Sequence, residues 1–269
     1  MRIWGFVKKY DVPLIDLQYD GYKTYETDGI KINLCDYITK VDYLINIPVL
    51  KGHCQTNITC ALKNMKGCIP DFEKRRFHTM GLHKSIAYLN KLIKQDLIIV
   101  DSMNGDLNFE EGGNPVQMNR IIAGKDPVLI DAYAAQLMGF SIEDVQYIAM
   151  AESIGVGTAD LENADIAELN KDSGTKKIKP SKKVQQFSKY IIEDSACSAC
   201  CGSLIYALER LYEKGLLNKL NEKLYIGQNF KNKKCDGLGI GTCTSEFEKY
   251  VKGCPPKAKD IVEFLEGHI

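Results

Sequence analysis

The sequence lacks the features that would place it in a membrane or on a nucleic acid. No apolar run approaches the roughly 20 residues that a membrane-spanning helix needs. Its 35 lysines and arginines are balanced by 35 acidic residues, so the formal net charge is zero. That balance argues against a general nucleic-acid binder, which carries an excess of positive charge. The opening residues MRIWGFVKKYD contain no apolar signal segment, and we expect a cytoplasmic protein.

Motifs of common catalytic sites are missing as well. The chain contains no Gly-x-Gly-x-x-Gly fingerprint, no phosphate-binding P-loop and no catalytic-triad signature, so no motif requires an enzyme. Cysteine, by contrast, is abundant, with ten residues among 269. Disulfides are disfavoured in a reducing compartment, which favours metal binding or redox chemistry for some of these thiols. The others are expected to pack as small buried side chains.

Alternating strand and helix patterns predict an α/β domain with a largely parallel sheet flanked by helices. Apolar and β-branched residues indicate buried strands over 41–50 and 96–105, each running into a polar loop. Ligands of such sheets bind beyond the carboxyl ends of the strands, which directs attention to those loops. Asp126 is expected to cap a helix that begins at Pro127. The expected helices cover 56–70, with Thr56 or Asn57 as N-cap, 83–94, 142–157 and the end of the strand–turn–helix segment 118–140.

Composition divides the chain into three regions. Residues 1–168 form the expected α/β domain, and residues 169–188 are polar, Lys-rich and interrupted by Gly174 and Pro180. This middle stretch is predicted to be a linker or an exposed hairpin. Residues 189–269 are Cys-rich with helical patterning, and we expect them to form a helical region that binds a cluster.

Four cysteines of the last region have the flanks expected of iron–sulfur ligands. Cys197 and Cys200 form a C-x2-C pair at the predicted start of a helix, whose N–H groups and positive partial charge favour an anionic cluster. Cys243 follows closely on two glycines, and Cys254 stands in Gly-Cys-Pro-Pro. Proline after a ligand cysteine is found in bacterial ferredoxins. We therefore expect a [4Fe-4S] cluster on Cys197, Cys200, Cys243 and Cys254, which we call the cysteine quartet.

Structural zinc is the alternative, because four thiolates also bind zinc. Such zinc sites usually pair two short Cys-containing knuckles, whereas ten residues separate Cys243 from Cys254. Cys201 and Cys235 are expected to be non-ligand thiols. On a helix, the side chain of Cys201 diverges by about 100° from that of Cys200, and Cys235 lies in a loop with weaker flanks.

A second candidate site lies in the segment LKGHCQTNITCALKNMKG. Lys51 and His53 follow a predicted strand, and Lys63 and Lys66, three residues apart, share one face of the predicted helix. These four residues are expected to bind a small anionic ligand, such as a carboxylate or phosphate. The alternative is that the lysines are solvated and His53 caps a loop. Cations nearby in sequence that would add to this pocket are Arg75, Arg76 and His78.

Two further groups are weaker candidates. The loop DSMNGDLNFEEGGNP could line the same pocket, with Asp101 as a proton acceptor, or be a solvated acidic loop. The thiols near the lysines do not share one helical face cleanly and are expected to be buried rather than to bind metal. These thiols belong to Cys54, Cys60 and Cys68.

Several stretches together resemble the family of the domain of unknown function 362 (DUF362), found in bacteria and archaea. The resemblance covers roughly residues 40–157 and rests on INIPVLKGHCQTNITCALKNMKGCIP, DLIIVDSMNG, AGKDPVLIDAYAAQLMGF and AESIGVG. The tail, with CSACCGSLIYALERL, GIGTC and VKGCPP, is similar to the variant whose C-terminal part carries four cluster cysteines. Many relatives carry a ferredoxin-like cysteine repeat instead. The resemblance implies an iron–sulfur protein but no agreed reaction.

The start of the chain departs from the family pattern. Relatives usually begin with a strand containing Lys-Pro-Asn and a helix–strand unit, whereas this sequence looks as if it starts partway through that unit. We expect a [4Fe-4S] protein with a redox or electron-transfer role, an oxidoreductase being one form of it. Its expected partners are an electron donor or acceptor protein or a small anionic substrate, with no nucleic acid and no membrane. The alternative is a non-catalytic binding or scaffold protein with a structural zinc ion or a redox-inert cluster.

Overall fold

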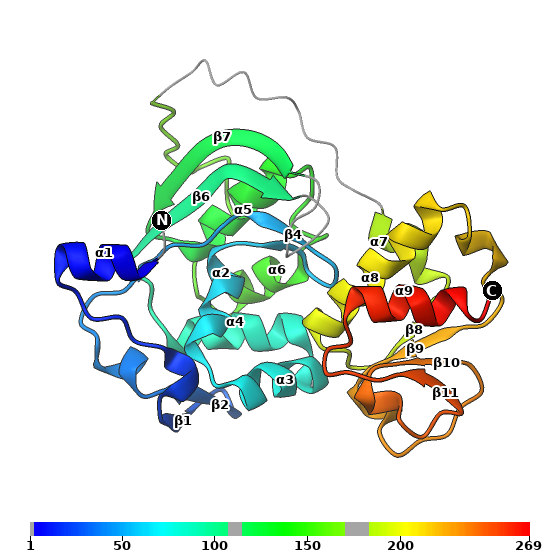
Figure 1. The fold of residues 1–269 in the computed structure, drawn as a ribbon. Coiled ribbons are helices and arrows are strands. Elements are labelled where there is room, and N and C mark those ends of the chain that lie inside the picture. Colours follow the sequence, from blue (N-terminus) through cyan, green and yellow to red (C-terminus); the bar gives the residue numbers. More distant parts are fainter. Residues whose placement is uncertain (1–2, 107–114, 170–182) are drawn as a thin grey trace.

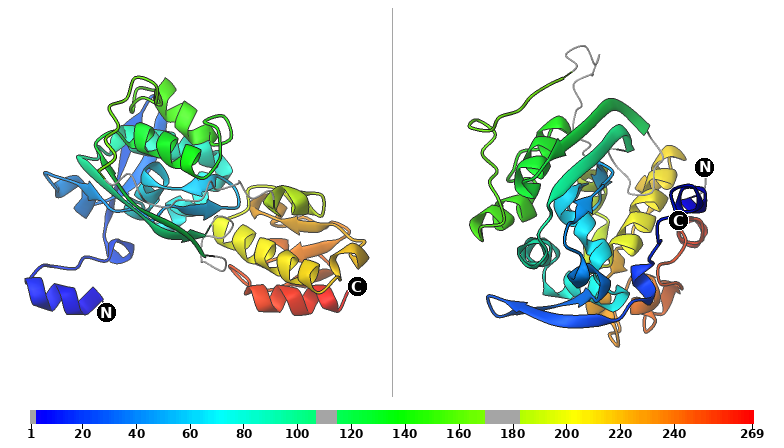
Figure 2. Two further views of the ribbon diagram at one scale, coloured as in Figure 1. Left: turned by 90° about the horizontal axis from the view of Figure 1, so that it is seen from above. Right: turned by 90° about the vertical axis from the view of Figure 1, so that its left-hand side faces the viewer.

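The chain folds into two units that lie side by side, as the computed structural model shows (Figures 1 and 2). The structure describes residues 3–106, 115–169 and 183–269. Each unit has its own hydrophobic core, one drawn from residues between Ile32 and Ala159 and the other from residues between Phe187 and Leu265. Most of the expected linker lies outside the described residues, but its end forms α7 (Lys183–Ser188) and places Phe187 in the second core.

The central sheet of the N-terminal unit is mixed rather than largely parallel. Its strands have the order β3 (Ile45–Asn46), β6 (Leu97–Asp106) and β7 (Pro115–Gly124). β3 pairs parallel to β6, while β6 and β7 are antiparallel. The strand expected over 41–50 is therefore short, and only one further bridge, between Val49 and Asp101, continues its parallel pairing.

The helix expected over 56–70 begins later than predicted. The chain first forms a hairpin of β4 (Lys51–His53) and β5 (Asn57–Thr59), and then α2 (Ala61–Asn64) followed by a 3-10 turn. Neither Thr56 nor Asn57 caps α2. Asp131, distant in sequence, accepts hydrogen bonds from the N–H groups of Ala61 (2.7 Å) and Leu62 (3.2 Å) instead. A cap from another helix fixes where α2 begins.

The other predicted helices of this unit are present with adjusted ends. The predicted cap of Asp126 is confirmed, because its Oδ1 accepts hydrogen bonds from the N–H groups of Val128 (2.8 Å) and Leu129 (3.1 Å). These predicted helices are α4 (Leu82–Leu92), α5 (Pro127–Leu137) and α6 (Gln146–Ser153), and α3 (Asp71–Met80) is a further helix that was not predicted. In the view of Figure 1 these helices lie beneath the long β6–β7 hairpin. At the start of the chain stand α1 (Ile3–Tyr10), β1 (Tyr22–Thr27) and β2 (Ile30–Cys35), the last two forming an antiparallel hairpin.

The C-terminal unit contains the all-parallel sheet. Its four strands have the order β11-β10-β9-β8, and every neighbouring pair is parallel. The region expected to be helical therefore also contains strands, which were not predicted because each has only three residues, too few for a strand pattern to stand out. The elements are β8 (Ile191–Glu193), α8 (Ser198–Glu213), β9 (Leu224–Ile226), β10 (Leu238–Ile240), β11 (Lys249–Val251) and α9 (Ala258–Glu266).

Membrane-spanning helices are not found in the part of the chain that the structure describes. No helix there has both the length and the apolar character that a crossing needs.

Candidate functional site

The four cysteines of the quartet all follow the carboxyl ends of strands in the parallel sheet. Cys197 and Cys200 come after β8, Cys243 after β10 and Cys254 after β11. In a parallel sheet these ends meet at one edge, where ligands of α/β proteins bind. Cys235 precedes β10 and so belongs to the opposite edge. The short strands therefore bring together thiols that are far apart in sequence.

Backbone contacts hold the loops of Cys243 and Cys254 against each other. The N–H of Thr242 donates to the carbonyl of Gly253 (2.9 Å), and the Thr242 hydroxyl donates to the same oxygen (3.1 Å). Gly253 has φ of 144°, and a Cβ there would lie 2.4 Å from Cα of Pro256. Only glycine fits this turn, which places Cys254 beside the Cys243 loop.

The other pair stands at the start of α8. Cys197 is the N-cap residue, and its carbonyl accepts the N–H of Cys201 (3.0 Å). Cys200 is half-buried at the sheet edge, while Cys201 turns into the C-terminal core and is 5% exposed. The two adjacent thiols diverge as expected from their helical spacing.

Burial and neighbouring thiols act together on Cys197 and Cys200. The pKa of Cys200 is raised to about 12, first by burial and then by the neighbouring Cys197, Cys254 and Cys243. The pKa of Cys197 is raised first by burial and then by Cys243 and Cys254, whereas Arg75 and Lys66 lower it. All four thiols are thus electrostatic neighbours, and two cations of the N-terminal unit, Arg75 and Lys66, lie within reach of Cys197.

No group of three or more His, Cys, Asp or Glu side chains in the described residues is spaced to hold a metal ion.

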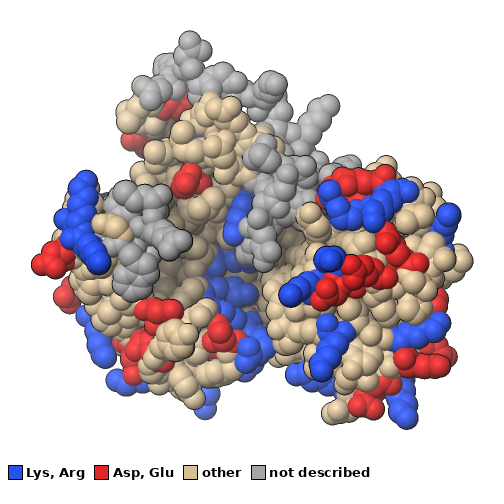
Figure 3. All heavy atoms as spheres, viewed as in Figure 1, with Lys and Arg blue, Asp and Glu red and all other residues tan. Residues whose placement is uncertain are grey.

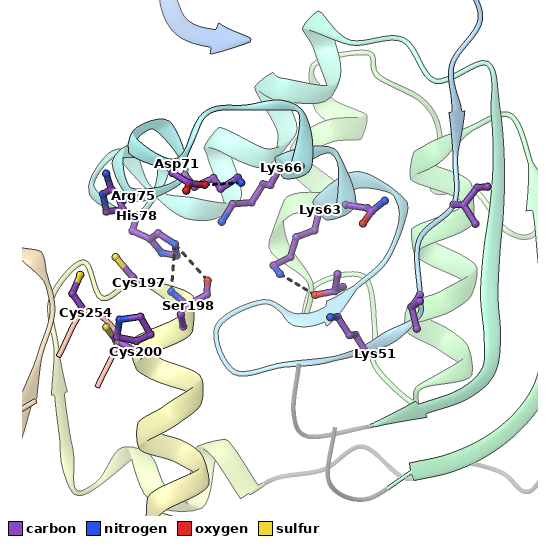
Figure 4. A pocket seen from close by; sticks show the side chains of 18 residues that line it. Lys51, Lys63, Lys66, Asp71, Arg75, His78, Cys197, Ser198, Cys200 and Cys254 are labelled. Atoms are coloured by element: carbon purple, nitrogen blue, oxygen red, sulfur yellow. Dashed lines mark hydrogen bonds and ion pairs between the residues drawn. The ribbon is translucent and has the colours of Figure 1, made fainter. Parts of the chain in front are cut away.

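A cavity of about 580 Å³ lies between the two units, and we call it the seam cavity. From the C-terminal unit it is lined by Cys197, Cys200 and Cys254. From the N-terminal unit it is lined by all three predicted lysines, Lys51, Lys63 and Lys66. Figure 4 shows the thiols on one side and the lysines on the other, and Figure 3 shows basic side chains gathered in the hollow between the units. Most residues of the two candidate sites of the sequence therefore border one cavity.

Lys63 is held in the cavity wall by its surroundings. Its side chain is 6% exposed, and its Nζ donates to Thr59 Oγ1 (2.9 Å). The helix that carries it begins on Asp131, whose carboxylate is fully enclosed. Burial raises the pKa of Asp131 to about 7, although hydrogen bonds from Cys60, the backbone of Leu62 and Ala61, and Tyr147 lower it.

Buried amides fix the same helix from its other side. Asn46 on β3 donates to the carbonyl of Ala61 (2.9 Å) and to Gln95 Oε1 (2.6 Å), and it accepts from Asn64 Nδ2 (2.7 Å). Asn90 on α4 donates to the carbonyl of Leu62 (2.8 Å). These hydrogen bonds hold α2 and the residues packed around it. The position of Lys63 is therefore set by a polar network within the core.

α3 adds further basic side chains to the cavity. Arg75 and His78 both line it, and His78 Nε2 accepts the N–H of Ser198 (3.4 Å), next to Cys197. Arg76, predicted together with them, instead pairs with the buried Glu73. Lys74 also lines the cavity and pairs with Asp71 (2.9 Å).

His53, also predicted for this site, is not among the lining residues. It is 3% exposed, and its Nδ1 accepts the N–H groups of Gln55 (3.1 Å) and Thr56 (3.2 Å). The side chain shapes the turn between β4 and β5, as the capping alternative expected. Asp101 and Asn104 are not lining residues either, whereas the side chain of Asp106, like Glu110 and Glu111, lies outside what the structure describes.

An apolar strip in the cavity was missed from the sequence. Ile47 and Val49 line the cavity and are 65% and 44% exposed. Together with Lys51 they stand at alternate positions, which places their side chains on one face of an extended chain. This alternation in the sequence could have indicated that the three side chains share one face. It was overlooked because the whole segment was predicted to be a buried strand.

Comparison with known proteins supports the family resemblance. The model of the domain of unknown function DUF362 matches residues 2–136, which is half of the chain. A curated relative, the thylakoid-associated protein sll1697 of Synechocystis sp., is 24% identical over 153 residues. That match covers 54% of this chain and 48% of the relative, so the chain spans about half the length of the relative. No solved structure matches.

Proposed function

The chain belongs to the DUF362 family, and from that premise we propose that it is an iron–sulfur protein with a role in electron transfer. The cysteine quartet would hold a [4Fe-4S] cluster, and the seam cavity would bind a small anion beside it. The observation that carries this proposal is the shared cavity, which three quartet thiols line together with the three predicted lysines.

The donor chemistry suits such a cluster, although the described thiols are not spaced for a metal ion as they stand. The four cysteines follow strand ends at one sheet edge, and thiolates are the usual ligands of iron–sulfur clusters. The N-terminus of α8, a helix of 16 residues, directs its N–H groups toward this edge. Arg75 and Lys66 supply positive charge near Cys197, which favours an anionic group. When bound, a [4Fe-4S] cluster supplies or accepts single electrons.

The residues of the N-terminal unit suit an anionic ligand with an apolar part. Lys51, Lys63 and Lys66 would bind a carboxylate or phosphate group by charge-assisted hydrogen bonds. Ile47 and Val49 offer an apolar surface to the rest of the ligand. Because the same cavity borders the quartet, a ligand there would lie next to the cluster. We also propose a cytoplasmic location, where free thiols are maintained.

The test is metal analysis and electron paramagnetic resonance of the anaerobically purified protein. About four irons per chain with matching sulfide, and a paramagnetic signal after reduction by dithionite, are expected. Iron and sulfide without any change of oxidation state would support a redox-inert cluster. About one zinc per chain and no signal would overturn the proposal and favour a binding or scaffold protein with a structural zinc ion.

A further inference from the structure

Two cysteines outside the quartet meet across the boundary between the units. Cys54 stands in the turn between β4 and β5, and Cys201 stands in the first turn of α8. Cys54 Sγ donates to the carbonyl of Ser198 (3.9 Å) in the same turn of α8, and the Cys54 thiol is the largest cause that raises the pKa of Cys201 well above its ordinary value. Cys54 packs against the core of the C-terminal unit although it belongs to the N-terminal unit. The two sulfurs are therefore neighbours despite the long stretch of chain between them.

Polar contacts beside the thiols keep this turn docked on α8. Gln55 Nε2 donates to Glu193 Oε1 (2.6 Å) and to the carbonyl of Ala196 (3.0 Å). The hydroxyl of Ser198 donates to Gln55 Oε1 (2.9 Å). A disulfide needs its two cysteine backbones to be already close, because strained geometry makes the bond unstable. The contacts of Gln55 supply that prior alignment.

The remaining thiols have other surroundings. Cys60 is enclosed beside Asp131 in the N-terminal core, and Cys35 and Cys68 are neighbours within that unit. The quartet cysteines occupy the sheet edge. The contact between Cys54 and Cys201 thus joins the two units at a place where no proposed cluster ligand is used.

We propose that Cys54 and Cys201 form a reversible disulfide that links the two walls of the seam cavity. The hairpin that contains Cys54 carries Lys51 and Thr59 in one wall, and the first turn of α8 carries Ser198 and Cys200 in the other. Closing the bond fixes the separation of the lysines from the quartet thiols. The disulfide does not require a cluster, so this proposal can be tested independently of the function proposed above.

Thiol–disulfide exchange with a low-molecular-weight disulfide, such as oxidised glutathione, forms the bond. The half-buried Cys54 is the more accessible sulfur, and its thiolate attacks the disulfide, releasing one glutathione thiolate that takes up a proton. Cys201 then loses its proton and displaces the second glutathione from Cys54. The two protein thiols are oxidised and one glutathione disulfide is reduced to two thiols, so electrons and protons balance.

The test is peptide mapping of the full chain after equilibration with defined ratios of reduced to oxidised glutathione. The anaerobically purified protein is used, and free thiols are blocked with iodoacetamide before digestion. A cross-linked peptide whose fragments assign the bond to Cys54 and Cys201, and which disappears on reduction, is expected. A bond from Cys54 to a quartet cysteine, or no bond at all, would overturn the proposal.

Two variants sharpen the assignment. Cys201→Ser should lose the cross-link and accumulate glutathione on Cys54, because the second step is blocked. Cys235→Ser, in a loop away from both thiols, should form the cross-link to the same extent as the original chain. Glutathione retained on Cys54 in the original chain, without a cross-link, would also contradict the proposal, and this readout does not depend on the variants folding.

Discussion

The two units position their functional side chains by different means. The C-terminal unit uses sheet geometry, since parallel strands of three residues each deliver their cysteine loops to one edge. The N-terminal unit uses a buried polar network, in which Asn46, Asn90 and Asp131 hold the short helix α2. Thiols on the sheet edge depend on loop placement, whereas Lys63 depends on hydrogen bonds within a core. Changes to the two units should therefore have different consequences.

The largest expected effect lies in the C-terminal unit. Cys254→Ser removes one of the four quartet thiols, and we expect the reconstituted protein to lose most of its iron and its visible absorbance. Cys235→Ser is the matched control, because that residue lies at the opposite edge of the sheet, and it should retain its iron. Equal losses in the two variants would show that the quartet is wrongly chosen.

The second-largest expected effect is a pH dependence of the free energy of unfolding, caused by Asp131 in the core of the N-terminal unit. The pKa of Asp131 is about 7, above the ordinary 3.8, so the folded chain binds this proton more tightly than the unfolded chain. The resulting stability is fully present below about pH 4 and is lost as the pH rises through about 7. A shift of this size corresponds to at most about 4 kcal/mol in the free energy of unfolding.

Urea unfolding between these pH values measures that loss. Asp131→Asn carries no proton to release, and its free energy of unfolding should change less with pH than that of the original chain. Asp126→Asn, a change at a helix cap near the surface, should keep the original slope. An unchanged slope in Asp131→Asn would show that the polar network does not depend on this proton.

Ligand binding gives a smaller effect that links the two units. Lys63→Met removes a buried ammonium group from the seam cavity, and binding of inorganic phosphate should weaken by about tenfold. Titration calorimetry measures it, with Lys94→Met as the control, because Lys94 is exposed and pairs with Asp96. Equal affinity in Lys63→Met and the original chain would exclude this lysine from the anion site.

The smallest effect is expected at the boundary between the units. Gln55→Ala removes hydrogen bonds to Glu193 and Ala196, which should lower the free energy of unfolding by about 1 kcal/mol. Gln117→Ala is the control, because the exposed amide of Gln117 donates only to Asn119 among the contacts described. This variant should change the free energy of unfolding by less. If the two variants unfold alike in urea, the turn at Gln55 does not contribute to joining the units.

Local signals in the sequence were sufficient for some of this architecture. Asp126 before Pro127 correctly marked the start of a helix, and the long apolar run of β6 correctly marked a strand. The start of α2 was not predictable in this way, because its cap is supplied by Asp131, 70 residues farther along the chain. Capping rules describe neighbours in sequence, and a cap from another helix leaves no local trace.

Some features of the candidate site could likewise be predicted from the sequence, and others could not. The three lysines were found by their residue type and place, but their shared cavity with the quartet depends on how the two units dock. Nothing in the sequence specified that docking. His53 and Arg76 have the chemistry of anion ligands, yet the structure directs one into a turn and the other to Glu73.

The placement of the quartet after the ends of β8, β10 and β11 also affects how cysteine spacing can differ between related sites. The stretch from Cys200 to Cys243 contains most of α8 and the whole of β9 and β10, so its length is set by these elements and not by the dimensions of a cluster. An insertion in a surface loop of that stretch would alter the cysteine spacing while the strand ends stayed in place. Homologous sites of this kind are therefore better aligned by the strand that precedes each cysteine than by a fixed spacing motif.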